Sequence, residues 1–459
     1  MPAPSILWLR QDLRLGDNPA LVAAAARGPV IPVYVLDDEA SGLRKMGAAQ
    51  RWWLHHSLES LSQSYKALGF TMLLRRGNCV AELMRLANET GAVRVNGNHH
   101  YEPWWREAES ELSAEIELVL HDGNRLAPPA SLLTGGGTRY RVFTPWWKAL
   151  LDQMPPPKPL QVPDRIVGVS GFETASLDDW MLLPIKPDWS VGFSEWRPGE
   201  KGARDAFLSF YPQLAHYDTS RNLPSTLGTS RLSPHLHFGE ISPATIWHHA
   251  SKAAGREAES FLREIGWRDY ATNLIDQFPD YGTRNGRPAY DAMPWRDDDA
   301  ADQDFSAWTK GLTGYPIVDA GMRELWATGF MHNRVRMIAA SFLVKHLMLD
   351  WRRGEQWFWN TLLDADYAAN TSNWQWVAGT GVDAPLFSRI MAPLSQSEKF
   401  NAGEYIRRWV PELATTSDPY IHDPDEYGAR PAAYPAKFIG HREARERALT
   451  AMRGIRNAG

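Results

Sequence analysis

Up to residue 125, short apolar runs alternate with amphipathic segments. The amphipathic segments, such as residues 48–68 and 80–90, carry apolar side chains at helical spacing. Strands that alternate with helices form parallel sheets covered on both faces, so this part predicts a doubly wound parallel α/β domain of Rossmann-like type. The predicted strands are residues 5–9, 30–36, 71–74, 93–96 and 116–120.

From residue 128 this alternation stops. The chain runs through glycines 135–137 and prolines 155–157 with few apolar side chains, which predicts a long surface connection between domains. From residue 200 the apolar residues recur at helical spacing, and the Ser-Pro pairs at 233–234 and 242–243 each predict a helix with an N-cap serine. The expected fold is α/β plus all-α, with an α/β domain at 1–127, a linker at 128–199 and a helical domain at 200–459.

Length and charge limit the possible functions. A chain of 459 residues exceeds what one hydrophobic core normally supports, which agrees with two domains. It has no run of 18 apolar residues and no signal-peptide pattern, so we expect a cytoplasmic protein with no membrane segment. The single cysteine, Cys79, excludes an intramolecular disulfide framework. A net charge of −5 gives no general affinity for nucleic acid, so any DNA contact must come from local cations. The candidates are Arg221, Arg231, Arg334, Arg336, Arg389, Lys399, Arg407 and Arg408.

Residues 351–376 are rich in indole, carboxylate and amide groups. A flat ligand with polar edges would use both kinds of group, although a tryptophan-rich pair of helices can also be ordinary core packing. Asp364 and Asp366 could bind a divalent metal, but no phosphate-binding glycine loop accompanies them, and we expect no metal. Five of the 21 tryptophans lie in this stretch: Trp351, Trp357, Trp359, Trp374 and Trp376.

Three shorter segments carry further candidate chemistry. Thr229, Ser230 and Ser233 flank Arg231 at the start of a predicted helix, where backbone N–H groups favour a phosphate, although an ordinary capped helix has the same pattern. In FLREIGWRDY, three side chains at positions i, i+3 and i+4 share a helix face, as in many surface salt bridges: Glu264, Trp267 and Arg268. In MHNRVRM, Asn333 and Met337 lie four residues apart on one face, where methionine is more often core filler.

The run TGYPIVDAGMRELWATGFMHNRVRM and its continuation through WQWVAGTGVDA, residues 313–384, resembles the flavin-binding core of the DNA photolyase and cryptochrome family. The resemblance extends from ILWLRQDLRLGDNPAL near the N-terminus to PELATTSDPYIHDP near the C-terminus. It implies a helical domain that binds FAD, reduced and anionic in the active form, and a substrate of ultraviolet-damaged DNA containing pyrimidine dimers. It implies no protein partner, and we expect a monomer.

The resemblance also assigns roles to residues at the cofactor. Residues 229–233 match the segment that holds the pyrophosphate of FAD. Asp364 and Asp366 would hydrogen-bond the flavin ring and its ribityl arm, and Asn370 would face flavin N5. Plant cryptochromes usually have a proton-donating aspartate there, so the amide favours a repair enzyme. The full set of implied cofactor residues is Tyr217, Thr229, Ser230, Arg231, Leu232, Ser233, Trp267, Arg268, Arg334, Asp364, Asp366 and Asn370.

At the substrate, the resemblance implies a cyclobutane dimer flipped out of the duplex. Glu264 would hydrogen-bond and protonate it, and Trp267 and Trp376 would wall the pocket with Met337. The pair His332-Asn333 matches enzymes that act on cyclobutane dimers, because enzymes for 6-4 photoproducts typically have a second histidine. Phosphates would be bound by Arg221, Arg334 and Arg389.

Light would excite the reduced flavin, which passes an electron to the dimer and recovers it after the ring splits. Trp374, Trp351 and Trp295 match the family's electron-transfer chain from the flavin to the surface. The alternative is a cryptochrome-type blue-light photoreceptor without repair activity. Signalling cryptochromes commonly carry a long C-terminal tail, and this chain stops at Gly459, which favours repair.

Two departures from the family pattern concern other parts of the chain. Trp104 and Trp105 stand where relatives that bind a folate antenna commonly have Asn-Glu. A second chromophore is therefore expected to be a deazaflavin or a flavin, near Met46 and Arg51, rather than methenyltetrahydrofolate at the usual site. The loop at residues 385–393 also departs from the common pattern, so the setting of Arg389 stays open.

Overall fold

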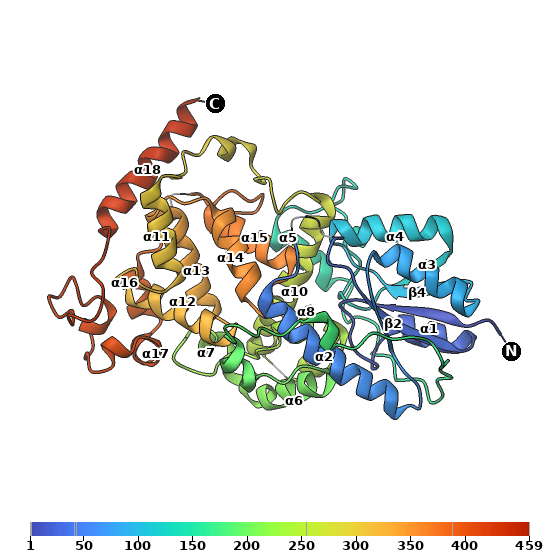
Figure 1. Ribbon diagram of the computed structural model, residues 1–459. Coiled ribbons are helices and arrows are strands. Elements are labelled where there is room, and N and C mark those ends of the chain that lie inside the picture. Colours follow the sequence, from blue (N-terminus) through green and yellow to red (C-terminus); the bar gives the residue numbers. More distant parts are fainter. Residues whose placement is uncertain (1, 41, 43, 254, 388, 459) are drawn as a thin grey trace.

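The computed structural model describes residues 2–40, 42, 44–253, 255–387 and 389–458, and Figure 1 shows a sheet-containing half beside a helical half. The sheet has five strands in the order β3-β2-β1-β4-β5, and every neighbouring pair is parallel. All five predicted strands are present, with small shifts at their ends. Their bounds are β1 Ser5–Leu9, β2 Val30–Leu36, β3 Leu73–Arg76, β4 Arg94–Asn98 and β5 Glu117–His121.

Helices cover both faces of this sheet, which explains why β1 and β2 are apolar throughout. Successive side chains of β1 point to opposite faces. Leu7 packs in a cluster with α1 and α2, whereas Ile6 packs with α3 and α4. The predicted doubly wound α/β domain is confirmed. The covering helices are α1 Pro19–Arg27, α2 Ala48–Ala67, α3 Cys79–Thr90 and α4 Pro103–Glu115.

The segment between the two halves is more than a surface connection. It contains α5 Phe143–Leu151, which has four buried side chains and packs on α10. The apolar positions of this short helix are spaced for one buried face, which the glycine- and proline-rich flanks obscure in the sequence. The domain boundaries at 127 and 199 stay a prediction. Three short 3₁₀ helices also lie in the segment: η1 Pro129–Ser131, η2 Asp178–Trp180 and η3 Ser190–Glu195.

The remaining elements are helical, and they enclose one large core that includes Trp308, Trp351 and Trp374. Among the described helices, none is both long and apolar enough to cross a membrane. The elements are α6 Glu200–Phe210, η4 Tyr211–His216, α7 Tyr217–Ser220, α8 Ser233–His237, α9 Pro243–Ala250, α10 Arg256–Gln277, η5 Pro288–Ala292, α11 Asp299–Thr309, α12 Pro316–Thr328, α13 Asn333–Ser341, the π-helical η6 Phe342–His346, α14 Trp351–Thr361, α15 Tyr367–Ala378, α16 Pro393–Lys399, α17 Gly403–Trp409, η7 Pro411–Leu413, η8 Tyr420–His422 and α18 His441–Ala458.

Side-chain caps fix where several of these helices begin. The prediction for Ser242 is confirmed, because its hydroxyl accepts from the backbone N–H of Thr245 at 3.0 Å at the start of α9. The prediction for Ser233 is wrong. Helix α8 begins one residue earlier than expected, so Leu232 holds the cap position and Ser233 is the first helical residue.

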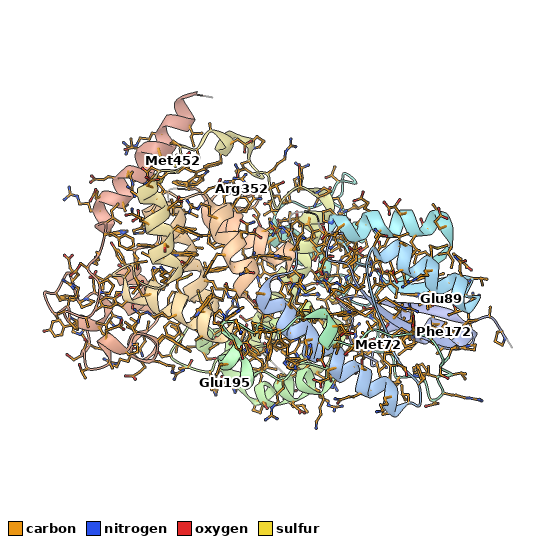
Figure 2. All side chains as sticks on the ribbon, in the orientation of Figure 1. Met72, Glu89, Phe172, Glu195, Arg352 and Met452 are labelled. Atoms are coloured by element: carbon orange, nitrogen blue, oxygen red, sulfur yellow. The ribbon has the colours of Figure 1, made fainter. Side chains whose placement is uncertain are left out.

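The two halves meet along a seam between residues 44–50 and the end of α14. Trp359 Nε1 donates to the carbonyl of Lys45 at 2.7 Å, and Gln50 Nε2 donates to the carbonyl of Trp359 at 3.0 Å. At Gly47 a β-carbon would come within 2.0 Å of the Trp359 carbonyl, so only glycine fits this approach. Figure 2 shows side chains filling the middle of the molecule where the halves meet.

Candidate functional site

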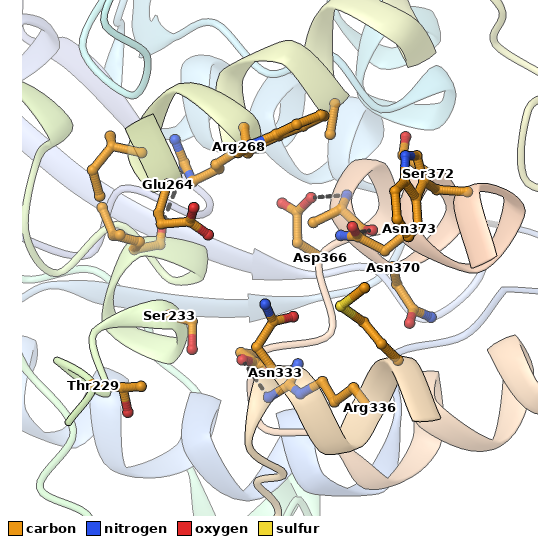
Figure 3. Close-up of a pocket in the computed structure, with 18 of the residues that line it drawn as sticks. Thr229, Ser233, Glu264, Arg268, Asn333, Arg336, Asp366, Asn370, Ser372 and Asn373 are labelled. Atoms are coloured by element: carbon orange, nitrogen blue, oxygen red, sulfur yellow. Dashed lines mark hydrogen bonds and ion pairs between the residues drawn. The ribbon is translucent and has the colours of Figure 1, made fainter. Parts of the chain in front are cut away.

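A cavity of about 700 Å³ opens between α7, α8, α10, α13 and α15 in the helical half. Every residue to which the resemblance gave a role at the FAD, at the dimer or in catalysis lines it, except for Trp351, Trp295 and Arg389. In Figure 3, Glu264 lies above the space, Asn333 below it and Asn370 to the right. The fold thus brings into one site residues that are far apart in the sequence, such as Tyr217 and Trp376, which are 159 positions apart.

Helix α10 provides the upper wall. Glu264, whose side chain is 30% exposed, pairs with Arg221 at 2.5 Å between Oε1 and Nη1. Burial lowers the pKa of Arg221, but Glu264 outweighs this effect and leaves the pKa raised. Trp267 stacks on Phe143 of α5, with ring centroids 3.5 Å apart and planes 7° apart, so Phe143 fixes the indole from outside the cavity.

Arg268 follows on the same helix and lies deeper. Its guanidinium donates to the carbonyls of Asn124 at 2.8 Å and Leu236 at 3.1 Å, which ties α10 to α8 and to the loop after β5. Burial and the nearby Arg125 cation lower the pKa of Arg268 to about 10. The side chain therefore remains a cation at neutral pH, at the wall of the cavity that α10 forms.

The segment 229–233 forms the wall opposite α15. Arg231 has a positive φ of 52°, an uncommon conformation for a side chain of this size that often marks a functional site. Its guanidinium lies 4.0 Å from the centre of the Trp196 ring, and Nε is buried without a hydrogen-bond partner among the described residues. Burial lowers the pKa of Arg231. A cation with an unused donor suits an anionic group here.

The start of α15 supplies the acidic groups. Asp366 caps this helix, because its Oδ1 accepts from the backbone N–H of Ala369 at 2.8 Å. Burial raises the pKa of Asp366, but His237 and the cations Arg125 and Arg268 outweigh it, so the net pKa is lowered. The carboxylate is therefore ionised at the cavity wall.

Asp364 and Asn370 are each held by one partner. Arg336 of α13 binds Asp364 through two hydrogen bonds of 3.0 and 2.9 Å. The sequence suggested Arg336 as a DNA contact, but this bidentate pair orients the carboxylate instead. Asn370 Nδ2 donates to the carbonyl of Glu355 at 3.0 Å and to its Oε1 at 2.8 Å.

Helix α13 brings Asn333, Arg334 and Met337 to the lower wall. Arg334 donates to Asn222 Oδ1 through Nε at 2.8 Å and Nη2 at 2.6 Å, which fixes its guanidinium beside the cavity. Burial and the Arg221 cation lower the pKa of Arg334.

Arg389 lies outside the main cavity. It lines a second cavity of about 560 Å³ that shares Asp218, Asn222, Arg334 and Met337 with the first, and its guanidinium is 5.6 Å from the Trp376 ring centre. Ser388, in the loop whose setting the sequence left open, lies outside the described residues. Positively charged side chains therefore line both cavities: Arg334 lies at both, and Arg389 lies at the second.

The three tryptophans of the predicted electron-transfer chain lie at different depths. Trp374 lines the cavity, and its ring contacts Phe358 and Trp308 at centroid distances of 5.0 and 6.3 Å. Trp351 is fully buried and donates to Asn285 Oδ1 at 2.9 Å. Trp295 is only half-buried against the helical core. The three side chains thus differ in burial, and the electron-transfer path that the resemblance implies stays a prediction.

Sequence reasoning missed the residues that hold the site from behind. Phe143, Asn222 and Glu355 each contact a predicted site residue without belonging to a recognisable motif. A local signal existed only for Glu355, which lies in the tryptophan-rich stretch 351–376.

The lining fits the FAD implied by the resemblance. Flat walls of Trp374 and Phe358 meet hydrogen-bonding groups at Asp364 and Asn370, as an isoalloxazine requires, and the volume lies in the usual range of ligand cavities. Ser372 Oγ is buried at the wall with no hydrogen-bond partner in the described part of the chain, and so could bind a ligand's polar atom. Residues 229–233 and Arg268 would face an anionic pyrophosphate.

Comparisons with known proteins agree. The family models "DNA photolyase" and "FAD binding domain of DNA photolyase" match residues 5–164 and 261–454. A deoxyribodipyrimidine photo-lyase of Agrobacterium fabrum is 45% identical, covering 99% of this chain and 98% of that protein. Cryptochrome-2 of Arabidopsis thaliana is 37% identical over 92% of this chain and 73% of its own length. The crystal structure of a bacterial class III photolyase from Agrobacterium tumefaciens has a TM-score of 0.94 at 44% identity and covers 100% of this chain and 98% of its own. The chain therefore belongs to the DNA photolyase and cryptochrome family.

Proposed function

We propose that this protein repairs cyclobutane pyrimidine dimers in DNA with the energy of light, using reduced FAD bound in the helical half. One observation carries the proposal: a single cavity is lined by residues with both kinds of expected role. Asp364, Asp366 and Asn370 are expected to contact the flavin, and Glu264, Trp267 and Met337 are expected to contact the dimer. A cofactor and a flipped-out pyrimidine dimer can therefore lie within one space. The deoxyribodipyrimidine photo-lyase of Agrobacterium fabrum, a relative over nearly its whole length, supports the same activity.

In this proposal, different parts of the cavity wall bind different parts of FAD. Residues 229–233 and Arg268 bind the pyrophosphate, while Arg336 and Asp364 orient the polar edge of the ring. Bound FAD, when reduced and excited by light, would supply an electron to the dimer and take it back after the cyclobutane bonds break. The protein orients both partners and keeps water away from them.

The same geometry accommodates a lesion that has left the duplex. Unstacking bases from the duplex costs a few kcal/mol, and the cost is lowest for damaged bases. This difference contributes to the selectivity for damaged over intact DNA. Trp267 and Trp376 offer flat apolar surfaces, and Glu264 can hydrogen-bond the pyrimidine edge once it leaves Arg221. Arg221, Arg334 and Arg389 would bind phosphates, and because such contacts ignore base sequence, recognition would follow the lesion. Asn333, rather than a second histidine, supports cyclobutane dimers as the substrate.

We further propose that Trp374, Trp351 and Trp295 carry electrons from the surface to the bound cofactor. Trp374 lines the cavity, Trp351 is buried in the same hydrophobic core and Trp295 is half-buried against that core. Such a path would restore the reduced cofactor after accidental oxidation, and would leave the repair of dimers by already reduced protein unaffected.

A second chromophore, a deazaflavin or a flavin, is proposed for the α/β domain. Arg51, near the expected position, pairs with Asp38 at the carboxyl end of β2. A solved archaeal photolyase from Sulfolobus tokodaii contains two FAD molecules. Mass spectrometry of the chromophores released from purified protein tests this proposal, and a folate would contradict it. A monomeric state and a cytoplasmic location stay predictions.

The deciding experiment is repair of ultraviolet-irradiated oligothymidylate by chemically reduced protein, in blue light and in darkness. We expect loss of dimers only in light, measured as recovery of thymine absorbance. If reduced flavin is bound and light restores nothing, the cryptochrome-type photoreceptor replaces the repair enzyme. An oligonucleotide carrying a 6-4 photoproduct is the substrate control and should remain unrepaired.

A further inference from the structure

Glu355 of α14 connects the cavity to the α/β half. Its carboxylate is buried, with 2% of the side chain exposed, and it binds Arg44 through Oε1 to Nη1 at 2.6 Å and Oε2 to Nη2 at 3.0 Å. Arg44 lies in the segment before α2, so a residue of the α/β half forms a two-point pair with a helix of the other half. The same Oε1 accepts a hydrogen bond from Asn370.

This arrangement decides which way the amide of Asn370 faces. Both atoms of Glu355 that meet the amide, the backbone carbonyl and Oε1, can only accept hydrogen bonds. The nitrogen of Asn370 must therefore point to Glu355, and both of its hydrogens are used. Since Asn370 lines the cavity, the polar atom it has left for a bound ligand is Oδ1, which accepts and cannot donate.

Arg44 is held firmly enough to act as a fixed partner. Its guanidinium lies 5.1 Å from the Trp359 ring centre and 4.9 Å from that of Tyr367, and only 18% of the side chain is exposed. Its neighbour Lys45 is anchored through its carbonyl to Trp359 Nε1. The guanidinium thus lies close to two rings of the helical half, and its position depends on the docking of the two halves.

We propose that Arg44 is a positioning residue: by pairing with Glu355 it locks Asn370 as a hydrogen-bond acceptor toward the flavin and so favours the reduced cofactor. The inference rests on the proposed function for the presence of flavin at this wall. N5 of a flavin accepts a hydrogen bond when oxidised and carries a hydrogen when reduced. An acceptor-only partner stabilises the form that carries the hydrogen, and the Arg44 cation offsets the negative charge that Glu355 would place nearby.

The test is the midpoint potential of bound flavin in Arg44→Gln, measured by spectroelectrochemistry with a reference dye. Without Arg44 the Glu355 carboxylate can turn away from Asn370, which leaves only the Glu355 backbone carbonyl to hold the amide nitrogen away from N5. The Glu355 charge is also no longer offset, and both changes disfavour reduction. We expect the ratio of reduced to oxidised flavin, at the potential where the wild type is half reduced, to fall about tenfold, equal to a shift of about 30 mV for a two-electron couple. An unchanged potential with flavin bound overturns the proposal.

Three further variants separate positioning from general loosening of the seam. Lys45→Gln removes the neighbouring charge, which is 56% exposed and pairs with Glu39, and should leave the potential unchanged. Arg44→Lys keeps the charge but not the two-point geometry and should restore part of the shift. In a Glu355→Gln background, Arg44→Gln should change the ratio less than twofold; a full tenfold effect there, or an equal shift in Lys45→Gln, also overturns the proposal. Wild-type repair in light tests the proposed function separately, because the potential is measured without any DNA.

Discussion

The ion pair between Glu264 and Arg221 places two residues expected at the DNA in contact with each other. Since Glu264 is only partly buried, the pair can open at modest cost when a dimer and a phosphate arrive as alternative partners. The pair also keeps Glu264 at the cavity mouth. One residue would then serve both to hold Arg221 in the free protein and to bind the lesion in the complex.

We expect Glu264→Gln to take up FAD normally and to repair dimers roughly tenfold more slowly in light, because a hydrogen bond to a charged group contributes about 1.5–3 kcal/mol. Repair is measured with chemically reduced protein under saturating DNA. Glu259→Gln, an exposed position on the same helix, is the matched control and should repair like the wild type. Equal repair by both variants would remove Glu264 from the substrate site.

At the scale of elements, the sequence did not predict α5, although this helix supports α10, whose site residues the sequence did predict. Phe143 is 2% exposed and stacks on Trp267, so α5 and α10 form one packed unit. The caps act in the same way: Asp366 starts α15 and thereby sets the direction from which Asn370 reaches the cavity. Helix starts and packed neighbours, rather than the site residues alone, define the geometry.

Phe143→Ala should lower the free energy of unfolding by about 3–5 kcal/mol, the usual cost of removing a buried aromatic ring. It should also weaken binding of dimer-containing DNA, because the indole of Trp267 loses the surface that fixes it. Urea denaturation followed by circular dichroism measures the first effect. Leu151→Ala, at an exposed position of α5, should change stability by less than about 0.5 kcal/mol. A Phe143→Ala protein as stable as this control would show that the stack contributes nothing.

At the scale of the whole molecule, the stability of the fold depends on pH through buried side chains that are neutral in the folded protein, such as His332. Burial, with help from neighbouring cations, lowers the pKa of His332 to about 4. In an unfolded chain a histidine takes up a proton as the pH falls through about 6.5. Between pH 6.5 and 4 the unfolded state therefore binds a proton that the folded state does not, so stability is lost on acidification through this window.

His332→Asn should remove roughly 2–3 kcal/mol of the stability lost between pH 7 and pH 4.5, because one pKa unit corresponds to about 1.4 kcal/mol. Asparagine keeps a side-chain acceptor for the backbone N–H of Arg334, which His332 caps at 3.2 Å. The free energy of unfolding is measured at both pH values for both proteins. If the variant loses as much stability as the wild type, His332 is not the group that titrates.

The seam between the two halves also links the α/β half to the proposed flavin site. Arg44 reaches Glu355 across 311 positions of sequence, so the reactive edge of the proposed flavin site is complete only when both halves are docked. If Arg44 acts as proposed above, the α/β half contributes through this ion pair to the electrostatic environment of the flavin site.

The sequence by itself determined the parallel α/β sheet, the helical half, and the residues that line the cavity, because strand and helix periodicity and the resemblance are read along neighbouring positions. It also led to the family, which the comparisons confirmed. Only the tertiary structure decided which side chains bind each other: Phe143 with Trp267, Arg336 with Asp364, and Arg44 with Glu355. A charge or a ring has many possible partners along a chain, and periodicity does not choose among them. The choice is made by the packing of distant elements, which brings one partner within hydrogen-bonding reach and buries the pair.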